Sequence, residues 1–282
     1  DGCRESIQHE IKGQQVLIFC SFSSLKRYKK DKLLNSLIKM ENIIFEHQFE
    51  TNPSLEDMKK ISYKYSKHNI DSIIGIGGGS AMDVAKISNI SINAYKKEIS
   101  LDQLLKDQRL INKIDPIPLY LIPTTAGTGS EVTPFATVWD YDSGIKKSLS
   151  NEKMFATKSY IDPDFLIDIP FDYAFSTCLD ALNQALESIW NKNANDYTNS
   201  LAINAVTKSL SALQKLDEIN TNESLRRELV TASLFAGVAI SQTRTALCHS
   251  ISYPTCAQAQ LDRTRPPRIQ LAQWSLPNQD LR

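Results

Sequence analysis

Short apolar runs alternate with longer amphipathic stretches through the first part of the chain. The runs are rich in branched residues, which favours strands buried on both faces of a sheet. The predicted strands are 16–20, 42–49, 73–76 and 117–122, and the predicted helices run from Ser23 or Ser24 to about Lys39, from Pro53-Ser54 to about His68, and from Ser80 to about Asn93. This alternation predicts an α/β fold, in which helices cover both faces of a parallel sheet.

The pattern changes after Asp162-Pro163-Asp164. Residues 134–140 and 145–150 predict a hairpin, but beyond it the chain reads as helices over about 174–191, 196–215 and 222–242. A sheet followed by helices alone predicts two domains. We therefore expect a nucleotide-binding domain over 1–170 and a helical domain over 171–254, with 255–282 as a tail that departs from both patterns.

A glycine turn follows the third predicted strand: Gly77-Gly78-Gly79-Ser80, with Asp83 and Lys86 further on. Ser80 stands where a helix N-cap is expected, and Asp83 is in the register of a capping box. Bare backbone at the start of a helix lets a phosphate approach, and the free N–H groups and the helix dipole attract it. An ordinary tight turn between a strand and a helix has the same pattern. The spacing matches neither the usual dinucleotide fingerprint nor a Walker loop.

A second loop of small and hydroxylated residues follows the fourth strand: Pro123-Thr124-Thr125-Ala126-Gly127-Thr128-Gly129-Ser130-Glu131. Its hydroxyls and N–H groups suit the phosphates or ribose of a nucleotide. A simple hydroxyl-rich turn without a ligand would have the same sequence pattern. Ligands bind at the carboxyl ends of the strands in open parallel sheets. Two such loops in one sheet therefore favour a nucleotide site.

The first helix of the second part carries Asp180, Gln184 and Glu187 at a spacing that places them on one face. Such a polar line either holds an ion or faces water. His249 stands in a segment of small residues, where a histidine is more often a hydrogen-bonded core residue than a ligand.

Composition adds few constraints. The formal net charge of 0 gives no electrostatic case for nucleic acid or an anionic membrane. The five cysteines are irregularly spaced, which suits reduced thiols in a cytoplasmic protein better than a disulfide framework. No apolar run reaches membrane-spanning length, and no signal segment opens the chain.

Together these motifs resemble the iron-containing (group III) alcohol dehydrogenase family, over about residues 10–254. The residues that carry the resemblance are Gly77–Ser80 with Asp83 and Lys86, the loop 123–131, Asp162-Pro163, and Asp180-Ala181-Leu182 with Glu187. The resemblance implies a Rossmann-like domain followed by an all-helical domain, as in dehydroquinate synthase-like folds. It also implies NAD(P) as cofactor, with Gly77, Gly78, Gly79 and Ser80 at the pyrophosphate, Asp83, Thr124, Thr125 and Thr128 lining the groove, and Lys147 reaching the nicotinamide ribose.

The metal site implied by the family consists of one Asp and three His for a divalent ion, Fe or Zn. Asp180 matches the first ligand and His249 the third, but Gln184 replaces the second, and an amide oxygen is a weaker substitute for imidazole. Arg263 occupies the place of the fourth ligand, and no histidine follows His249.

The tail 255–282 is rich in Gln, Arg and Pro and has no helical period. We interpret it as out-of-frame or foreign sequence, with a divergent surface tail as the alternative. The helical domain is then incomplete, which predicts uncovered apolar faces and self-association. A homo-oligomer fits the same expectation.

Two features bear on specificity. The turn Ser21–Ser24 after the first strand lacks the Asp that NAD-preferring family members often carry there, and Lys26 and Arg27 are near, which favours NADP. The segment Ser241–Thr245 and Gln184 resemble the phosphonoacetaldehyde reductase branch. Arg244 would then hold the substrate phosphonate, unless it forms a surface or interdomain salt bridge.

The resulting hypothesis is a metal-dependent oxidoreductase that transfers a hydride between NAD(P)H and a small aldehyde or alcohol. The alternative is a catalytically inactive nucleotide-binding fragment that keeps both loops and lacks a complete metal site. A lyase-type synthase that uses NAD within its cycle is a third hypothesis, although the further basic and His residues that it needs are missing.

Overall fold

The computed structural model describes residues 2–27 and 31–252 of the chain. Contacts between residues divide it into two compact units. Of the described residues, the sheet unit comprises 2–27, 31–124, 130–141 and 146–165, and the helical unit comprises 125–129, 142–145 and 166–252. The tail 255–282 lies outside the described residues, so its interpretation as foreign sequence stays a prediction, as do the three domain bounds.

The sheet unit is built on a five-stranded parallel sheet in the order β2-β1-β3-β4-β7. The strands are β1 (Val16–Cys20), β2 (Ile43–Glu46), β3 (Ser72–Gly77), β4 (Leu119–Pro123) and β7 (Lys158–Ser159). Every residue of β1, β3 and β4 is buried, as apolar strands covered on both faces require. The four predicted strands are confirmed, although β2 is shorter than expected.

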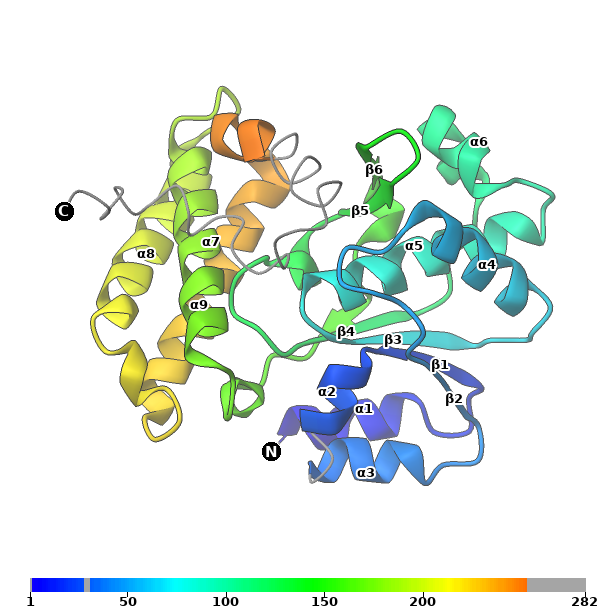
Figure 1. Ribbon diagram of the computed structural model, residues 1–282, viewed down its shortest axis with the longest axis horizontal. Helices are drawn as coiled ribbons and strands as arrows, with labels where there is room; N and C mark the ends of the chain where they lie inside the picture. Colours follow the sequence, from blue (N-terminus) through cyan, green and yellow to red (C-terminus); the bar gives the residue numbers. More distant parts are fainter. Residues whose placement is uncertain (1, 28–30, 253–282) are drawn as a thin grey trace. The chain divides into compact units, whose positions relative to one another are not determined.

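Helices cover both faces of this sheet, as Figure 1 shows. The helices of this unit are α1 (Gly2–Glu10), α2 (Phe22–Arg27), α3 (Lys32–Ile38), α4 (Leu55–Ser66), α5 (Gly79–Tyr95) and α6 (Leu101–Lys106). Alternate strand residues enter two separate clusters: Leu17 and Ile73 pack with α4, α5 and α6, whereas Ile18 and Ile74 pack with α1 and α3. The period of two along each strand thus gives each layer of helices its own core.

The helix predicted from Ser23 or Ser24 to about Lys39 is wrong as a single element. The structure has α2 and, separately, α3, whose N-cap Asp31 accepts hydrogen bonds from the N–H groups of Leu33 and Leu34. The helix start predicted at Pro53-Ser54 is confirmed, because α4 begins at Leu55 and the hydroxyl of its N-cap Ser54 accepts from the N–H of Asp57 at 2.9 Å.

A hairpin of β5 (Phe135–Asp140) and β6 (Ile145–Ser150) forms a second, two-stranded sheet, which confirms the predicted hairpin. Short 3-10 helices complete the connections: η1 (Gln108–Lys113), η2 (Ser130–Val132), η3 (Glu152–Met154), η4 (Pro163–Leu166) and η5 (Leu216–Glu218).

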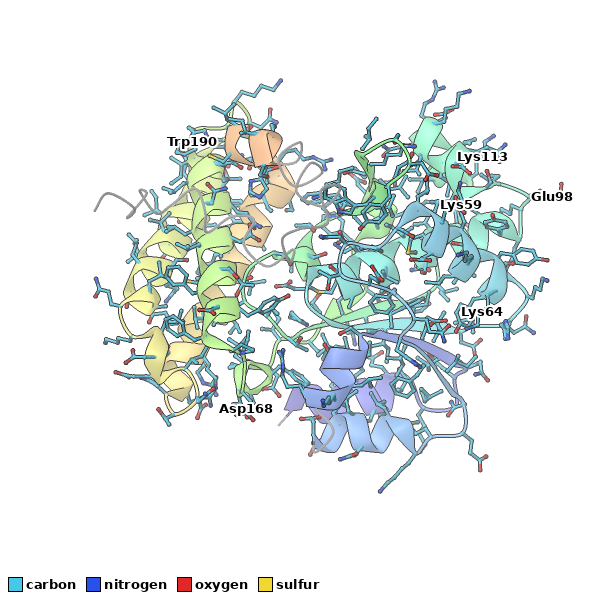
Figure 2. All side chains as sticks on the ribbon, in the orientation of Figure 1. Lys59, Lys64, Glu98, Lys113, Asp168 and Trp190 are labelled. Atoms are coloured by element: carbon cyan, nitrogen blue, oxygen red, sulfur yellow. The ribbon has the colours of Figure 1, made fainter. Side chains whose placement is uncertain are left out.

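The helical unit contains α7 (Phe171–Ile189), α8 (Asp196–Leu213) and α9 (Glu223–Thr243), which pack side by side (Figure 1). The three helices predicted for this part are confirmed. Small side chains fill their common interface: Ala181, Ala185, Ala202, Ala205, Ala236 and Ala239. Such residues let helix backbones approach closely. Trp190, labelled in Figure 2, follows α7 and is exposed.

Among residues 2–27 and 31–252, no helix combines the length and the apolar character that a bilayer crossing requires. Cys20, Cys178 and Cys248 are free thiols.

Candidate functional site

The strand order creates a topological switch point between β1 and β3. The chain leaves β1 towards β2 on one side and then crosses to β3 on the other. In open parallel sheets of this order, ligands bind in the crevice at the carboxyl ends of the two strands. Ser21 and the first turn of α2, which begins at Phe22 and not at the predicted Ser23 or Ser24, follow β1 there, and the glycine turn follows β3.

Position 77 accepts only a residue without a side chain. Its φ is +151°, and a Cβ on it would lie 2.7 Å from the Cβ of Ala81 and 3.8 Å from the Oγ of Ser24. The first contact shows how closely α5 approaches β3, and the second shows that the two turns of the switch point are neighbours. Ser24 is held in the first turn of α2, because its N–H and its hydroxyl both contact the Ser21 hydroxyl.

The N-terminus of α5 differs from the prediction. The N-cap is Gly78 and not Ser80, and Gly78 offers no side-chain hydrogen bond. Ser80 lies in the first turn of the helix, where its hydroxyl accepts from the N–H of Asn52 at 3.2 Å. The first N–H groups of a helix have no partner within it, so α5 begins without a side-chain cap at the switch point. That arrangement fits a pyrophosphate on Gly77, Gly78, Gly79 and Ser80.

Asp83 does not form the predicted capping box. Its carboxylate accepts hydrogen bonds from the Ser130 hydroxyl at 2.8 Å and from the N–H and hydroxyl of Thr137 at 2.9 and 3.0 Å. The helix register had suggested a local partner, and the real partners are distant in sequence. Asp83 therefore fastens α5 to η2 and β5.

Lys86 completes this network inside the sheet unit. It is fully buried, and its Nζ donates to the Ser130 and Thr133 hydroxyls and to the Phe135 carbonyl. Burial lowers the pKa of Lys86 to about 8, although the charges of Asp83 and Glu131 oppose the shift. Burial likewise raises the pKa of Glu131. The sequence motif contained these residues, but their pairing could not be read from it.

The second loop is divided between the two units. Thr124 belongs to the sheet unit, where its N–H donates to the Gly77 carbonyl at 2.9 Å. Thr125 and Thr128 belong to the stretch 125–129 of the helical unit; Thr125 is buried and Thr128 is half-buried.

The glycines of the second loop have a packing role in the helical unit. A Cβ on Gly127 would lie 2.7 Å from the Cβ of Thr177 on α7. A Cβ on Gly129, whose φ is +57°, would lie 2.4 Å from the Cα of Gly237 on α9. Close approach of α7 and α9 explains these glycines without a ligand.

Lys147 lies on β6, and its Nζ contacts the Asp140 carboxylate across the hairpin at 2.7 Å. Its side chain is 36% exposed, so the ion pair is accessible to solvent. A contact between Lys147 and a cofactor ribose would require Lys147 to leave Asp140.

The polar line on α7 is not a solvated face. Asp180, Gln184 and Glu187 are 8%, 4% and 0% exposed, so the interpretation as a water-facing stripe is wrong. His249 lies over this line. Its Nδ1 is 2.5 Å from Glu187 Oε2, and its Nε2 is 3.6 Å from Asp180 Oδ1.

These side chains fit a cation. Gln184 Oε1 is buried and has no hydrogen-bond partner among the described residues, which is costly unless a further group completes the site. A separation of 3.6 Å between Asp180 and His249 suits two ligands of one ion, since metal–ligand distances are about 2.0–2.2 Å. Three protein donors with an open position are usual in catalytic zinc sites.

The electrostatics agree with this fit. Burial lowers the pKa of His249, but the contacts with Asp180 and Glu187 more than compensate and raise it to about 9. Burial raises the pKa of Glu187, whereas the His249 contact and the Ala246 N–H lower it, with a net value of about 2. Surroundings that favour a charged imidazole also favour a metal cation. The described residues hold no group of three or more His, Cys, Asp or Glu in ligating geometry, as the replacement at Gln184 leads one to expect.

Arg244 is exposed at the C-cap of α9 and has a positive φ of +71°. Its carbonyl accepts from the Thr243 hydroxyl at 3.0 Å and from the Asn191 amide at 3.3 Å. These contacts stabilise a backbone conformation that non-glycine residues rarely adopt.

Family models match both parts of the chain. The model "Iron-containing alcohol dehydrogenase" matches residues 1–163, and the model "Fe-containing alcohol dehydrogenase family, C-terminal" matches residues 174–278. The second range extends into the tail 255–282.

Individual relatives agree. Aldehyde-alcohol dehydrogenase 2 of Entamoeba histolytica is 32% identical over 231 residues, which cover 77% of this chain and 25% of that protein. NAD-dependent methanol dehydrogenase of Bacillus methanolicus is 31% identical over 192 residues, which cover 67% of this chain and 48% of that protein. The crystal structure of an iron-containing alcohol dehydrogenase of Thermotoga maritima superposes with a TM-score of 0.79 at 31% identity, covering 91% of this chain and 69% of that one. The chain thus spans from a quarter to about half the length of the curated relatives that it matches.

Proposed function

We propose a function from one premise, which is that the chain belongs to the iron-containing alcohol dehydrogenase family. The protein of which this chain is a part or the whole transfers a hydride reversibly between a nicotinamide cofactor and a small aldehyde or alcohol. A bound nicotinamide would supply or take the hydride, and a bound divalent ion would polarise the substrate oxygen.

The observation that carries this proposal is the pair Asp180 and His249, whose facing atoms are 3.6 Å apart in a buried setting. Asp180, His249 and Gln184 would hold the ion. Gln184 contributes the buried amide oxygen that otherwise has no partner among the described residues. Iron or zinc fits a set of mixed oxygen and nitrogen donors.

The cofactor would bind at the switch point of the sheet unit. Gly77, Gly78, Gly79 and Ser80 offer backbone N–H groups to the pyrophosphate. Thr124, Thr125 and Thr128 supply hydroxyls along the groove, and Lys147 turns from Asp140 to the nicotinamide ribose. Asp83 acts indirectly, because its hydrogen bonds keep α5 in place.

The cofactor is proposed to be NADP rather than NAD. Two neutral hydroxyls, those of Ser21 and Ser24, follow β1 at the start of α2. Glu46 ends β2, but its carboxylate is already engaged by Lys64, which Figure 2 labels, and by Tyr65. The turn thus presents no carboxylate that would repel a 2′-phosphate.

The substrate is proposed to be an aldehyde with an anionic group, of which phosphonoacetaldehyde is the specific candidate. The guanidinium of Arg244, an exposed residue, would bind the phosphonate through two parallel N–H donors. Arg244→Gln should then raise KM for phosphonoacetaldehyde at least tenfold and leave KM for acetaldehyde within twofold.

The test is turnover of NADPH with small aldehydes, with Fe²⁺ or Zn²⁺ supplied, for the wild-type chain and for Asp180→Asn and His249→Gln. Metal-dependent turnover that either variant abolishes supports the dehydrogenase. Tight NADPH binding with neither metal uptake nor turnover would instead favour the alternative, an inactive nucleotide-binding fragment.

A further inference from the structure

Glu187 is a fully buried carboxylate on α7 that none of the ligand positions above includes. Its Oε2 accepts from the Ala246 N–H at 2.9 Å and contacts His249 Nδ1 at 2.5 Å. Its Oε1 accepts from the N–H groups of Cys248 and His249 at 2.5 and 3.2 Å. All four acceptor positions of the carboxylate are therefore in use.

These contacts determine which nitrogen of His249 carries a proton. An ionised carboxylate only accepts hydrogen bonds, so Nδ1 must be the donor to Glu187. Asn183 Nδ2 lies 3.3 Å from the same nitrogen, a longer contact. Nε2 is then the nitrogen that faces Asp180, and in a neutral ring Nε2 is the nitrogen that carries the lone pair able to coordinate an ion.

The same carboxylate also fixes the backbone below the ring. Residues 247–252 are helical, and the N–H groups that Glu187 accepts lie at the start of this segment. The Glu187 side chain thus fixes both the backbone position of His249 and the orientation of its ring.

We propose that Glu187 is a positioning residue, whose buried carboxylate holds His249 with Nδ1 protonated and Nε2 presented to a divalent cation beside Asp180 and Gln184. This inference rests on the proposed metal site. A carboxylate behind a ligating histidine increases the basicity of the ligand and fixes the ring, and its loss typically reduces metal affinity 10–100-fold.

The experiment measures Zn²⁺ affinity by calorimetry for the wild-type chain, Glu187→Gln and Ser188→Ala. Glutamine keeps the shape of the side chain, but its NH₂ group cannot accept the hydrogen bonds that one carboxylate oxygen accepts. Ser188 is the matched control, because it is equally buried on α7 and its hydroxyl bonds to Thr243 at 3.0 Å rather than to His249. A second measurement is the ¹⁵N–¹H spectrum of the zinc-bound ring, assigned with His249→Gln.

We expect Glu187→Gln to weaken zinc binding 10–100-fold and Ser188→Ala to change it less than twofold, with a protonated Nδ1 and a zinc-bound Nε2 in the wild type. Zinc binding by Glu187→Gln within twofold of wild type would overturn the inference and leave the proposed function intact. If the wild type binds zinc no better than His249→Gln, the metal site itself fails, and the inference fails with it. Should Glu187→Gln not fold, Glu187→Asp and the wild-type spectrum decide the question.

Discussion

The two glycine loops look alike in sequence, but the helices that approach their glycines differ: the helix that follows directly in the chain at the first loop, and two helices distant in sequence at the second. At the first loop, Gly77 is required because α5 begins against β3, and the helix N-terminus stays without a side-chain cap. At the second loop, Gly127 and Gly129 are required because α7 and α9 pack against the backbone. A glycine-rich turn after a parallel strand therefore indicates a close approach, and only the neighbouring atoms tell whether a ligand or a helix makes it.

The largest effect should come from Gly129→Ala. The new Cβ would lie 2.4 Å from the Gly237 Cα at a φ of +57°, so α9 must move or the loop must unfold. We expect a loss of about 4 kcal/mol of unfolding free energy, measured by urea denaturation. Gly13→Ala is the control, because its φ is +77° with nothing within 4 Å, and it should cost only about 1 kcal/mol. Equal losses in the two variants would refute the packing role.

Lys86→Met should have the next largest effect, since it tests the network that fastens the first loop to η2. Removing the ammonium leaves the half-buried Asp83 and the buried Glu131 without their cation, and the loss should be about 3 kcal/mol at pH 7. Thr133→Val, which removes one of the partners of Lys86, should cost about 1 kcal/mol.

The difference in stability between the wild type and Lys86→Met should depend on pH. The pKa of Lys86 falls from 10.5 to about 8 on folding, so the unfolded chain binds more protons between these values and stability rises with pH there. The wild type should gain about 2 kcal/mol relative to Lys86→Met between pH 8 and pH 10. A difference that stays constant over that interval would mean that Lys86 is not buried as a charged group.

Gly77→Ala should separate stability from binding. We expect a loss of about 2 kcal/mol from the 2.7 Å approach of the new Cβ to Ala81. NADPH affinity, measured by fluorescence titration at a temperature where the variant is folded, should fall more than tenfold. Gly78→Ala has a φ of −81°, which alanine tolerates, and should retain more stability. Unchanged NADPH affinity in Gly77→Ala would remove the first loop from the cofactor site.

Ser80→Ala should have the smallest effect. Its hydroxyl makes one hydrogen bond, to the Asn52 N–H at 3.2 Å, and it does not cap α5. We expect a loss of about 0.5 kcal/mol in thermal or urea unfolding. A loss above about 1.5 kcal/mol would indicate that Ser80 caps the helix after all.

Elements with a strong period could be predicted from the sequence, and contacts between distant residues could not. The apolar runs of β1, β3 and β4 and the long periodic helices α7, α8 and α9 were predicted within a few residues. The break between α2 and α3 was missed, although Asp31 is an ordinary N-cap residue. A local rule assigned Asp83 to a capping box, but tertiary partners on η2 and β5 use its carboxylate instead.

The candidate site divides in the same way. Asp180, Gln184 and Glu187 could be placed on one face of a helix by spacing alone, but their burial depends on the segment that carries His249. The family resemblance supplied ligand positions and no role for Glu187. A buried acid one helical turn beyond two ligand positions is a signal that later sequence reasoning can use.

The stretch 125–129 has a consequence for how this chain comes to be folded. Its Ala126 side chain is part of the apolar cluster that includes residues of α7, α9 and η5. Its Gly129 packs closely against Gly237 of α9. During synthesis this stretch leaves the ribosome well before α9, so it stays exposed to solvent until α9 is made and packs against it. A polypeptide cut to residues 166–252 would contain all three long helices and would still lack part of their core. The polypeptide 166–252 alone should therefore lack fixed side-chain packing. Linking residues 125–129 to it as a peptide should restore that packing.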